Sequence, residues 1–220
     1  MLTLSQVKQN PQILEFIHQT EIALAVSGFT EHGLNHSNLV AARARTVAKE
    51  IGLTKRQQEL SAIAGFCHDM GNFLSRTYHH YLGAILFHQV FHEVADPKDL
   101  SLIMQAIANH DKEEMKFSNP ISAVLVLADK SDVRRQRVIV RELDKIKADI
   151  HDRVNYATKT SKLGINKRRK RITLTLKINT NFVPVMDYFE IFTERMVYCR
   201  EAAKYLGYQF GLVINNFKLL

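Results

Sequence analysis

An adjacent histidine and aspartate at the end of a small, apolar segment form the clearest chemical feature of this sequence. The segment Ala64–Cys67 leads directly into His68 and Asp69. A helix that ends there presents an imidazole nitrogen and a carboxylate oxygen together, and such mixed ligands suit iron, manganese or zinc. A second such pair, 151–152, lies in the charged stretch 145–153 and is interpreted as part of a solvated helix face.

Two more side chains, far away in the sequence, could complete a cation site. His36 begins an expected helix, and Asp129 ends the apolar run Ala123–Ala128. Burying an unpaired carboxylate at the end of such a run would cost several kcal/mol. A metal ion or another cation is therefore expected to compensate the charge of Asp129.

The order and spacing of these residues resemble the HD superfamily of phosphohydrolases, which is named for an H…HD…D ligand pattern on a helical bundle. The resemblance covers residues 36–135: His36 is similar to the first histidine, His68 and Asp69 to the doublet, and Asp129 to the final aspartate. It implies a hydrolase in which a metal-bound hydroxide attacks a phosphoester or phosphoanhydride of a nucleotide. Asp69 would then be a catalytic residue that bridges two ions, as its family counterpart does.

Two further histidines extend the resemblance to the dinuclear members of the superfamily. His79 opens a stretch similar to their HxxxGA helix start, and His110 closes the segment Ala106–His110. Members of the HD-GYP group and the HD-type symmetrical diadenosine tetraphosphate hydrolases carry histidines in these places for a second ion. Two ions are therefore expected, iron or manganese, with zinc also possible. The site could instead hold a single ion, with His79 and His110 on the substrate phosphate, and His80 competes with His79 as the ligand.

The stretch Asp129–Arg135 resembles the D-K-x-E-x-x-R stretch of the diadenosine tetraphosphate hydrolases, whose lysine and arginine contact nucleotide phosphates. Lys130 and Arg135 are accordingly expected to bind phosphate, with a solvated basic face as the alternative. Asp132, one helical turn after Asp129, could orient the water or a leaving-group proton. In an unbroken helix Arg135 would lie about 120° from Asp129 around the axis, so the helix must bend or the long side chain must wrap back.

Two departures from the family pattern narrow the expected chemistry. Asn72 stands where many dinuclear members have the lysine of an HDxGK motif, so a phosphate contact from this position is not expected. Asp111 follows His110, and the GYP motif is absent, which disfavours cyclic di-GMP as the substrate.

The elements that must position these residues are mostly helices. Apolar residues recur at helical spacing through 13–25, 39–51, 57–68, 79–94, 98–109 and 118–157, whereas 172–178 alternates like a half-buried strand, 186–206 is an amphipathic helix and 208–214 a second strand. The sequence predicts a mainly α fold, with an HD-type helical bundle over 1–160, a basic linker over 161–171 and a small β-α-β module over 172–220. This module is expected to pack on the bundle or to complete a sheet with a second subunit, giving a homodimer.

The composition is that of a globular protein, with 46% hydrophobic and 24% charged residues. The two cysteines, Cys67 and Cys199, form no paired motif, and no membrane span is expected, which favours a reducing, cytoplasmic location. Cys67 is interpreted as a small core residue rather than as a nucleophile. The net charge is +8, but the basic run Lys167–Arg171 lacks interleaved aromatics, so a solvated linker is preferred to a nucleic-acid patch.

Three functions remain in competition. The first is a phosphohydrolase that acts on a nucleotide or another phosphorylated small molecule. The second is a regulatory protein that senses a nucleotide in the HD pocket without turnover, because the fold alone does not determine function. The third is an RNA-directed hydrolase, which the charge of +8 suggests and which would bind with a steep salt dependence.

Overall fold

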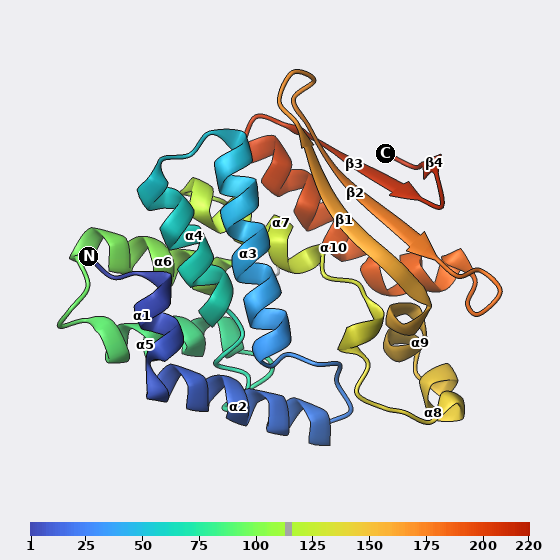
Figure 1. Ribbon diagram of the computed structural model, residues 1–220, viewed down its shortest axis with the longest axis horizontal. Coiled ribbons are helices and arrows are strands. Elements are labelled where there is room, and N and C mark those ends of the chain that lie inside the picture. The colour runs from blue at the N-terminus through green and yellow to red at the C-terminus, as the bar shows by residue number, and fades with distance from the viewer. Residues whose placement is uncertain (113–115) are drawn as a thin grey trace. The chain divides into compact units, whose positions relative to one another are not determined.

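The computed structural model describes residues 1–112 and 116–220, which divide into two compact units, Met1–Asp129 and Lys130–Leu220. The chain is mainly helical with one small sheet near its C-terminal end (Figure 1), so the predicted fold class is confirmed. Among the described residues, none of the helices combines the length and the apolar character that crossing a bilayer requires.

The first unit is a bundle of helices whose core is built around α4. Seven helices are described, the last of which extends one residue into the second unit: α1 (Leu4–Gln9), α2 (Pro11–Val26), α3 (Leu34–Ile51), α4 (Lys55–Cys67), α5 (His79–Phe91), α6 (Pro97–Asn109) and α7 (Pro120–Lys130). Helix α4 packs against α3 and α6, and α5 packs against α6. All residues of α4 from Leu60 to Cys67 are buried, which is why this segment combines small and apolar side chains.

Two glycines allow the close approaches that bring helix ends together. A Cβ on Gly65 of α4 would lie 3.0 Å from the backbone of Ala41 in α3, so any side chain would push these helices apart. A Cβ on Gly71, in the turn after α4, would lie 2.6 Å from the amide nitrogen of Gly83 in α5. These contacts fix the end of α4 against α3 on one side and against the start of α5 on the other.

The second unit contains a four-stranded sheet with a helix on one face. Its elements are the short helix η1 (Arg135–Arg137), α8 (Leu143–Ala148), α9 (Ile150–Ala157), β1 (Thr158–Asn166), β2 (Arg171–Ile178), α10 (Val185–Tyr205), β3 (Gln209–Ile214) and β4 (Phe217–Lys218). The strands follow the order β1-β2-β3-β4; β2 and β3 are parallel, and the two outer pairs are antiparallel. Helix α10 connects β2 to β3, as the sequence predicted for a β-α-β module.

The expected helix over 118–157 is wrong in its second half. Helix α7 ends at Lys130, and Arg134 adopts an extended backbone before three short helices follow. After the apolar run that ends at Ala128, the chain is densely charged, and 138–140 is a β-branched Val-Ile-Val triplet that disfavours a helix. The proposed position of Asp132 one helical turn beyond Asp129 therefore does not hold.

The expected basic linker over 161–171 also differs from the structure. Residues up to Asn166 belong to β1, which pairs antiparallel with β2, and the run Lys167–Lys170 is the turn of this hairpin. Only Leu163 and Ile165 are apolar in the second half of β1, which lies at the edge of the sheet, where strands commonly carry charged side chains. The boundary between the two compact units likewise falls after Asp129 rather than after residue 160.

Candidate metal centre

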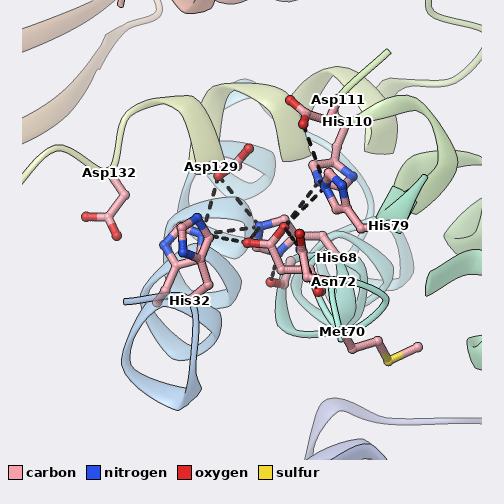
Figure 2. Close-up of polar contacts among 12 residues, drawn as sticks. His32, His68, Met70, Asn72, His79, His110, Asp111, Asp129 and Asp132 are labelled. Carbon is pink, nitrogen blue, oxygen red and sulfur yellow. Dashed lines mark hydrogen bonds and ion pairs between the residues drawn. The ribbon is translucent and has the colours of Figure 1, made fainter. Parts of the chain in front are cut away.

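Five helix ends of the first unit bring four histidines and two aspartates together. His36 lies in the first turn of α3, His68 and Asp69 follow α4, His79 begins α5, His110 follows α6, and Asp129 lies in the last turn of α7. All six side chains are buried. Figure 2 shows His68 between Asp129 on one side and His79 and His110 on the other. The structure thus gathers all six residues that the sequence predicted as metal ligands.

The first part of the cluster contains His36, His68, Asp129 and one oxygen of Asp69. The Nε2 atoms of His36 and His68 are 3.2 Å apart. Oδ2 of Asp69 lies 3.5 Å from His36 Nε2 and 3.2 Å from His68 Nε2. Oδ1 of Asp129 lies 3.4 and 3.6 Å from the same two nitrogens. Two nitrogens and two oxygens therefore surround one small volume.

The second part contains His79, His110 and the other oxygen of Asp69. The Nε2 atoms of the two histidines are 3.1 Å apart, and Oδ1 of Asp69 lies 3.4 Å from His79 Nε2 and 3.6 Å from His110 Nε2. Each of the two oxygens of Asp69 therefore points to a different pair of imidazoles. Among the described residues, His36-His68-Asp69, His68-His110-Asp129 and Asp69-His79-His110 each offer ligand atoms within 4.8 Å of one another.

The hydrogen bonds of the imidazoles fix which nitrogen is available. The Nδ1 atoms of three histidines contact the carbonyl oxygen three residues earlier in the chain: His68 to Gly65 at 2.9 Å, His79 to Arg76 at 2.7 Å and His110 to Ile107 at 2.7 Å. Since a carbonyl only accepts, each Nδ1 carries a hydrogen, and Nε2 of the neutral ring keeps its lone pair. Metal-binding histidines are oriented in the same way.

This arrangement fits a divalent cation by its donor chemistry. Two neutral Nε2 atoms at 3.1 Å cannot hydrogen-bond to each other, because both are acceptors. A cation between them and the oxygens of Asp69 would satisfy both lone pairs and would also compensate the buried carboxylates. Nitrogen and oxygen donors without thiolate suit iron, manganese or zinc, so the cluster is compatible with a divalent metal site.

The protonation of the cluster reflects its crowded charges. Burial lowers the pKa of His68, but the carboxylates of Asp69 and Asp129 outweigh this effect and raise it to about 10. Burial raises the pKa of Asp69, but His68 and the other histidines hold it well below its usual value. Burial and the neighbouring His110 lower the pKa of His79 to about 3. Without a metal, His68 is therefore the protonated, positively charged imidazole at pH 7, whereas His79 is neutral.

Asn72 has a role that the sequence did not reveal. Its amide donates to Oδ1 of Asp69 at 3.1 Å and to the carbonyl oxygen of Asp69 at 2.9 Å. Arg76 in turn donates to the amide oxygen of Asn72 at 2.9 Å. Asn72, for which the sequence predicted no phosphate contact, therefore orients Asp69. Its place three residues after Asp69, in a turn at a helix end, is the signal that could have indicated this contact.

Two more polar residues adjoin the cluster and were not predicted. The ring of His32 lies edge-on to that of His36, with centroids 5.6 Å apart, and Oδ2 of Asp111 lies 3.7 Å from His79 Nε2. Asp111 is only partly buried, in contrast to the histidine beside it. In the sequence, Asp111 stood out only as a departure from the GYP motif.

The geometry bears on two alternatives from the sequence: whether His79 or His80 is the ligand, and whether Cys67 is a core residue or a nucleophile. His79, and not His80, belongs to the candidate ligand groups of the described residues. Cys67 is fully buried, and burial raises the pKa of its thiol far above its usual value. A thiolate nucleophile at this position is therefore disfavoured, in agreement with its interpretation as a core residue.

The remaining predicted site residues lie in the second unit, where each has contacts of its own. Lys130 is the last residue of α7 and is buried. Asp132 accepts a hydrogen bond from Nε of Arg134 at 2.7 Å, and Nη1 of Arg137 lies 3.8 Å from its second oxygen. Arg135 donates to the carbonyl oxygen of Tyr156 at 2.8 Å, and its guanidinium stacks 4.1 Å from the ring centre. Their roles in binding phosphate or moving a proton stay predictions.

Comparison with known protein families identifies the domain that contains the cluster. A family model described as the HD domain matches residues 33–149, which is more than half of the chain and includes all six residues of the cluster. No curated protein sequence matches this chain.

Proposed function

Because the chain belongs to the HD-domain family, whose members are generally metal-dependent hydrolases, we propose that it hydrolyses a phosphoester or phosphoanhydride bond of a nucleotide, using two divalent ions. One observation carries this proposal: the two oxygens of Asp69 face different pairs of histidines, at 3.2–3.5 Å and 3.4–3.6 Å. A carboxylate in this position is suited to bridge two cations. A single ion would leave His79 and His110 with two facing lone pairs.

Each residue of the cluster has a distinct task in this proposal. His36, His68 and Asp129 would hold one ion, and His79 and His110 the other, with Asp69 shared between them. Divalent ions in such a centre lower the pKa of water and neutralise negative charge on a phosphoryl group. The carbonyl acceptors of Gly65, Arg76 and Ile107 keep the three imidazoles in the required tautomer, and Asn72 keeps Asp69 oriented.

We further propose the substrate class, the residues that bind its phosphates, and the metal. A nucleotide is proposed because the stretch Asp129–Arg135 resembles the phosphate-binding stretch of hydrolases that act on dinucleotides. Lys130 and Arg135 would contact the phosphates, and Asp132 would orient the water or a leaving-group proton. We propose iron or manganese as the metal, with zinc as the alternative, because all the donors are imidazole nitrogen or carboxylate oxygen.

The test combines metal content with turnover. Protein purified without added metal would be analysed for transition elements, then loaded with manganese or ferrous iron and assayed against nucleoside mono-, di- and triphosphates and dinucleoside polyphosphates. The variant Asp69→Asn should lose turnover, whereas the matched control Asp144→Asn, at an exposed position of α8, should keep it. Equal turnover from Asp69→Asn would refute the proposal. Tight nucleotide binding without product over hours would favour a nucleotide-sensing protein instead.

We also propose that the chain forms a homodimer through its second unit. Helix α10 and β3 border an apolar groove of about 320 Å³ whose lining includes Phe189, Met196, Leu212, Leu219 and Leu220. Exposed apolar surface of this kind is often covered in an oligomer. Sedimentation equilibrium should give twice the chain mass, and Val197→Asp, at an exposed position that lines this groove, should reduce it to one chain.

A further inference from the structure

The two units of the chain differ sharply in charge. The second unit, Lys130–Leu220, holds 20 of the 30 Lys and Arg residues but only nine of the 22 Asp and Glu residues. Its formal charge is therefore +11, whereas that of the first unit is −3. The excess of basic residues thus belongs entirely to the unit that lies outside the metal cluster.

Within the second unit, the positive charge is concentrated on the sheet. The hairpin from Thr158 to Ile178 contains eight Lys and Arg residues and no carboxylate, and β3 and β4 contain no carboxylate either. The acidic side chains of the unit lie on helices or in the segments between them, four of them on α10. In the part of the chain that the structure describes, no ion pair joins a cation of this sheet to an Asp or Glu side chain, and Arg171 donates to the backbone oxygen of Leu220.

The register of the strands places these cations on one face. On β2 the apolar residues Ile172, Leu174 and Leu176 are buried and face α10, so Arg171, Thr173, Thr175 and Lys177 lie on the open face. Thr175 of β2 pairs with Lys162 of β1 on one side and with Val213 of β3 on the other. Val213 in turn pairs with Lys218 of β4. Because paired residues project from the same face of a sheet, Lys162 and Lys218 also lie on the open face. Figure 1 shows the four strands as one sheet, with α10 running along it.

One end of the open face is hollowed into a basic cavity of about 440 Å³. Arg169, Arg171 and Lys218 line it together with the polar side chains of Asn166, Thr173 and Gln209. Gly211 of β3 leaves the space in which the guanidinium of Arg171 lies. A Cβ on Gly211 would lie only 2.7 Å from Nε of Arg171. Asn166 accepts from the backbone nitrogen of Arg169 at 2.9 Å, which holds the hairpin turn at the rim.

We propose that this open face binds the phosphate backbone of a nucleic acid. From Arg171 to Lys177 the row of side chains spans about 20 Å at about 3.3 Å per residue, which is longer than one phosphate group and suits a polyanion. The cavity at one end provides a place for one nucleotide, and Lys162 and Lys177 continue the positive surface away from it.

The chemistry of the face also defines how it binds. Besides Val213 and the threonines of β2, it carries cations and amides but no aromatic side chain, so its contacts go to phosphates rather than to stacked bases. Binding is therefore independent of sequence and strongly dependent on salt. Phe217 and Leu219 are exposed on either side of Lys218, but side chains alternate along a strand, so Phe217 lies on the face of its partner Ile214 and not on the open face. The open face therefore favours nucleic acid over an anionic membrane. This inference does not depend on the proposed hydrolase activity, because it uses no residue of the metal cluster.

The experiment measures the fluorescence anisotropy of labelled oligouridylate and oligothymidylate of about 20 nucleotides with the full chain. Affinity is recorded between about 50 and 200 mM salt, and the oligonucleotides are recovered to show that they are intact. The triple variant Lys162→Gln, Arg169→Gln, Lys218→Gln is compared with the control Lys145→Gln, Lys147→Gln, Lys204→Gln, which removes the same charge from α8 and α10. All six positions are exposed, so both variants should fold.

The wild type and the control should bind alike, and the sheet variant should bind at least about tenfold more weakly at the lowest salt. Its slope of log affinity against log salt should be smaller by about 2, because each lost phosphate contact removes about 0.7. Four results would overturn the proposal: no binding by the wild type, equal loss in both variants, full competition by tripolyphosphate at equal phosphate concentration, or binding to phosphatidylserine vesicles without binding to oligonucleotides.

Discussion

The amide of Asn72 donates a hydrogen bond to Oδ1 of Asp69, the oxygen that faces His79 and His110. A neutral amide thus orients the carboxylate of Asp69 without adding a positive charge. Residues that orient metal ligands commonly change metal affinity about 10- to 100-fold when they are replaced. The first prediction tests this contact.

Replacing Asn72 with leucine should weaken the binding of the second ion about 10- to 100-fold, because Asp69 loses the donor that fixes its orientation. The measurement is metal competition against a chelator. Asn38→Leu, at an exposed position of α3, is the control and should bind metal as the wild type does. An unchanged affinity in Asn72→Leu would mean that this hydrogen bond does not support the site.

Replacing His110 with alanine should reduce the metal content from two ions per chain to one. Nε2 of His110 lies closest to Oδ1 of Asp69 and Nε2 of His79, and its ring also lies edge-on to that of His68. The ion held by His36, His68 and Asp129 should remain, because these three residues keep their own close contacts. Elemental analysis after gel filtration gives the count. Loss of both ions, or of neither, would contradict the division of the cluster into two parts.

Metal affinity should rise with pH through neutrality. Asp69 and Asp129 raise the pKa of His68 to about 10 in the metal-free protein, so this imidazole is protonated at pH 7 and an entering ion must displace its proton. The apparent affinity for the ion at His36 and His68 should therefore increase about tenfold per pH unit until the pH approaches about 10. His79 adds no such dependence above pH 4, because its pKa is lowered to about 3.

Calorimetric titration in two buffers of different ionisation enthalpy measures this effect. Release of about one proton from His68 is expected at pH 7, because the raised pKa of this imidazole lies above that pH. Binding that releases no proton would show that His68 is already neutral before the metal enters.

Replacing Gly71 with alanine should destabilise the fold by about 1–3 kcal/mol and disturb the second ion, because the new methyl group would lie 2.6 Å from the amide nitrogen of Gly83 and even closer to the carbonyl of His79. Denaturant unfolding and metal content are the measurements. Gly164→Ala is the matched control, since its Cβ would meet only Thr173 at 3.9 Å. Equal stability of the two variants would show that the α4–α5 approach can relax.

The sequence predicted the mainly α fold and the HD family, and both are confirmed. These predictions succeeded because the apolar periodicity stops close to His68, Asp69 and Asp129, and the helices α4 and α7 end at or beside these residues. The helix prediction failed after Lys130, where helical spacing in a charged stretch gave no sign of the extended backbone at Arg134. The hairpin over 158–178 was missed in part, because β1 is an edge strand whose polar residues resemble a linker.

The contacts of single side chains were the least accessible part of the site. The link between Asn72 and Asp69 depends on the turn that follows α4, and the stacking of Arg135 on Tyr156 joins residues that are 21 positions apart. Neither contact follows from periodicity, because each is decided by packing between elements rather than within one. The open face of the sheet was likewise not predicted, because its residues can be identified only when the register of the strands is known.

The proposed hydrolase depends on Asp69 contacting two ions, one through each oxygen. The most direct test is an anomalous-difference map from crystals of the protein loaded with manganese. Two peaks about 3.5–4 Å apart are expected, one beside His36, His68 and Asp129 and the other beside His79 and His110, with Asp69 between them. A single peak, or peaks that leave Asp69 without a metal contact on either oxygen, would contradict the account.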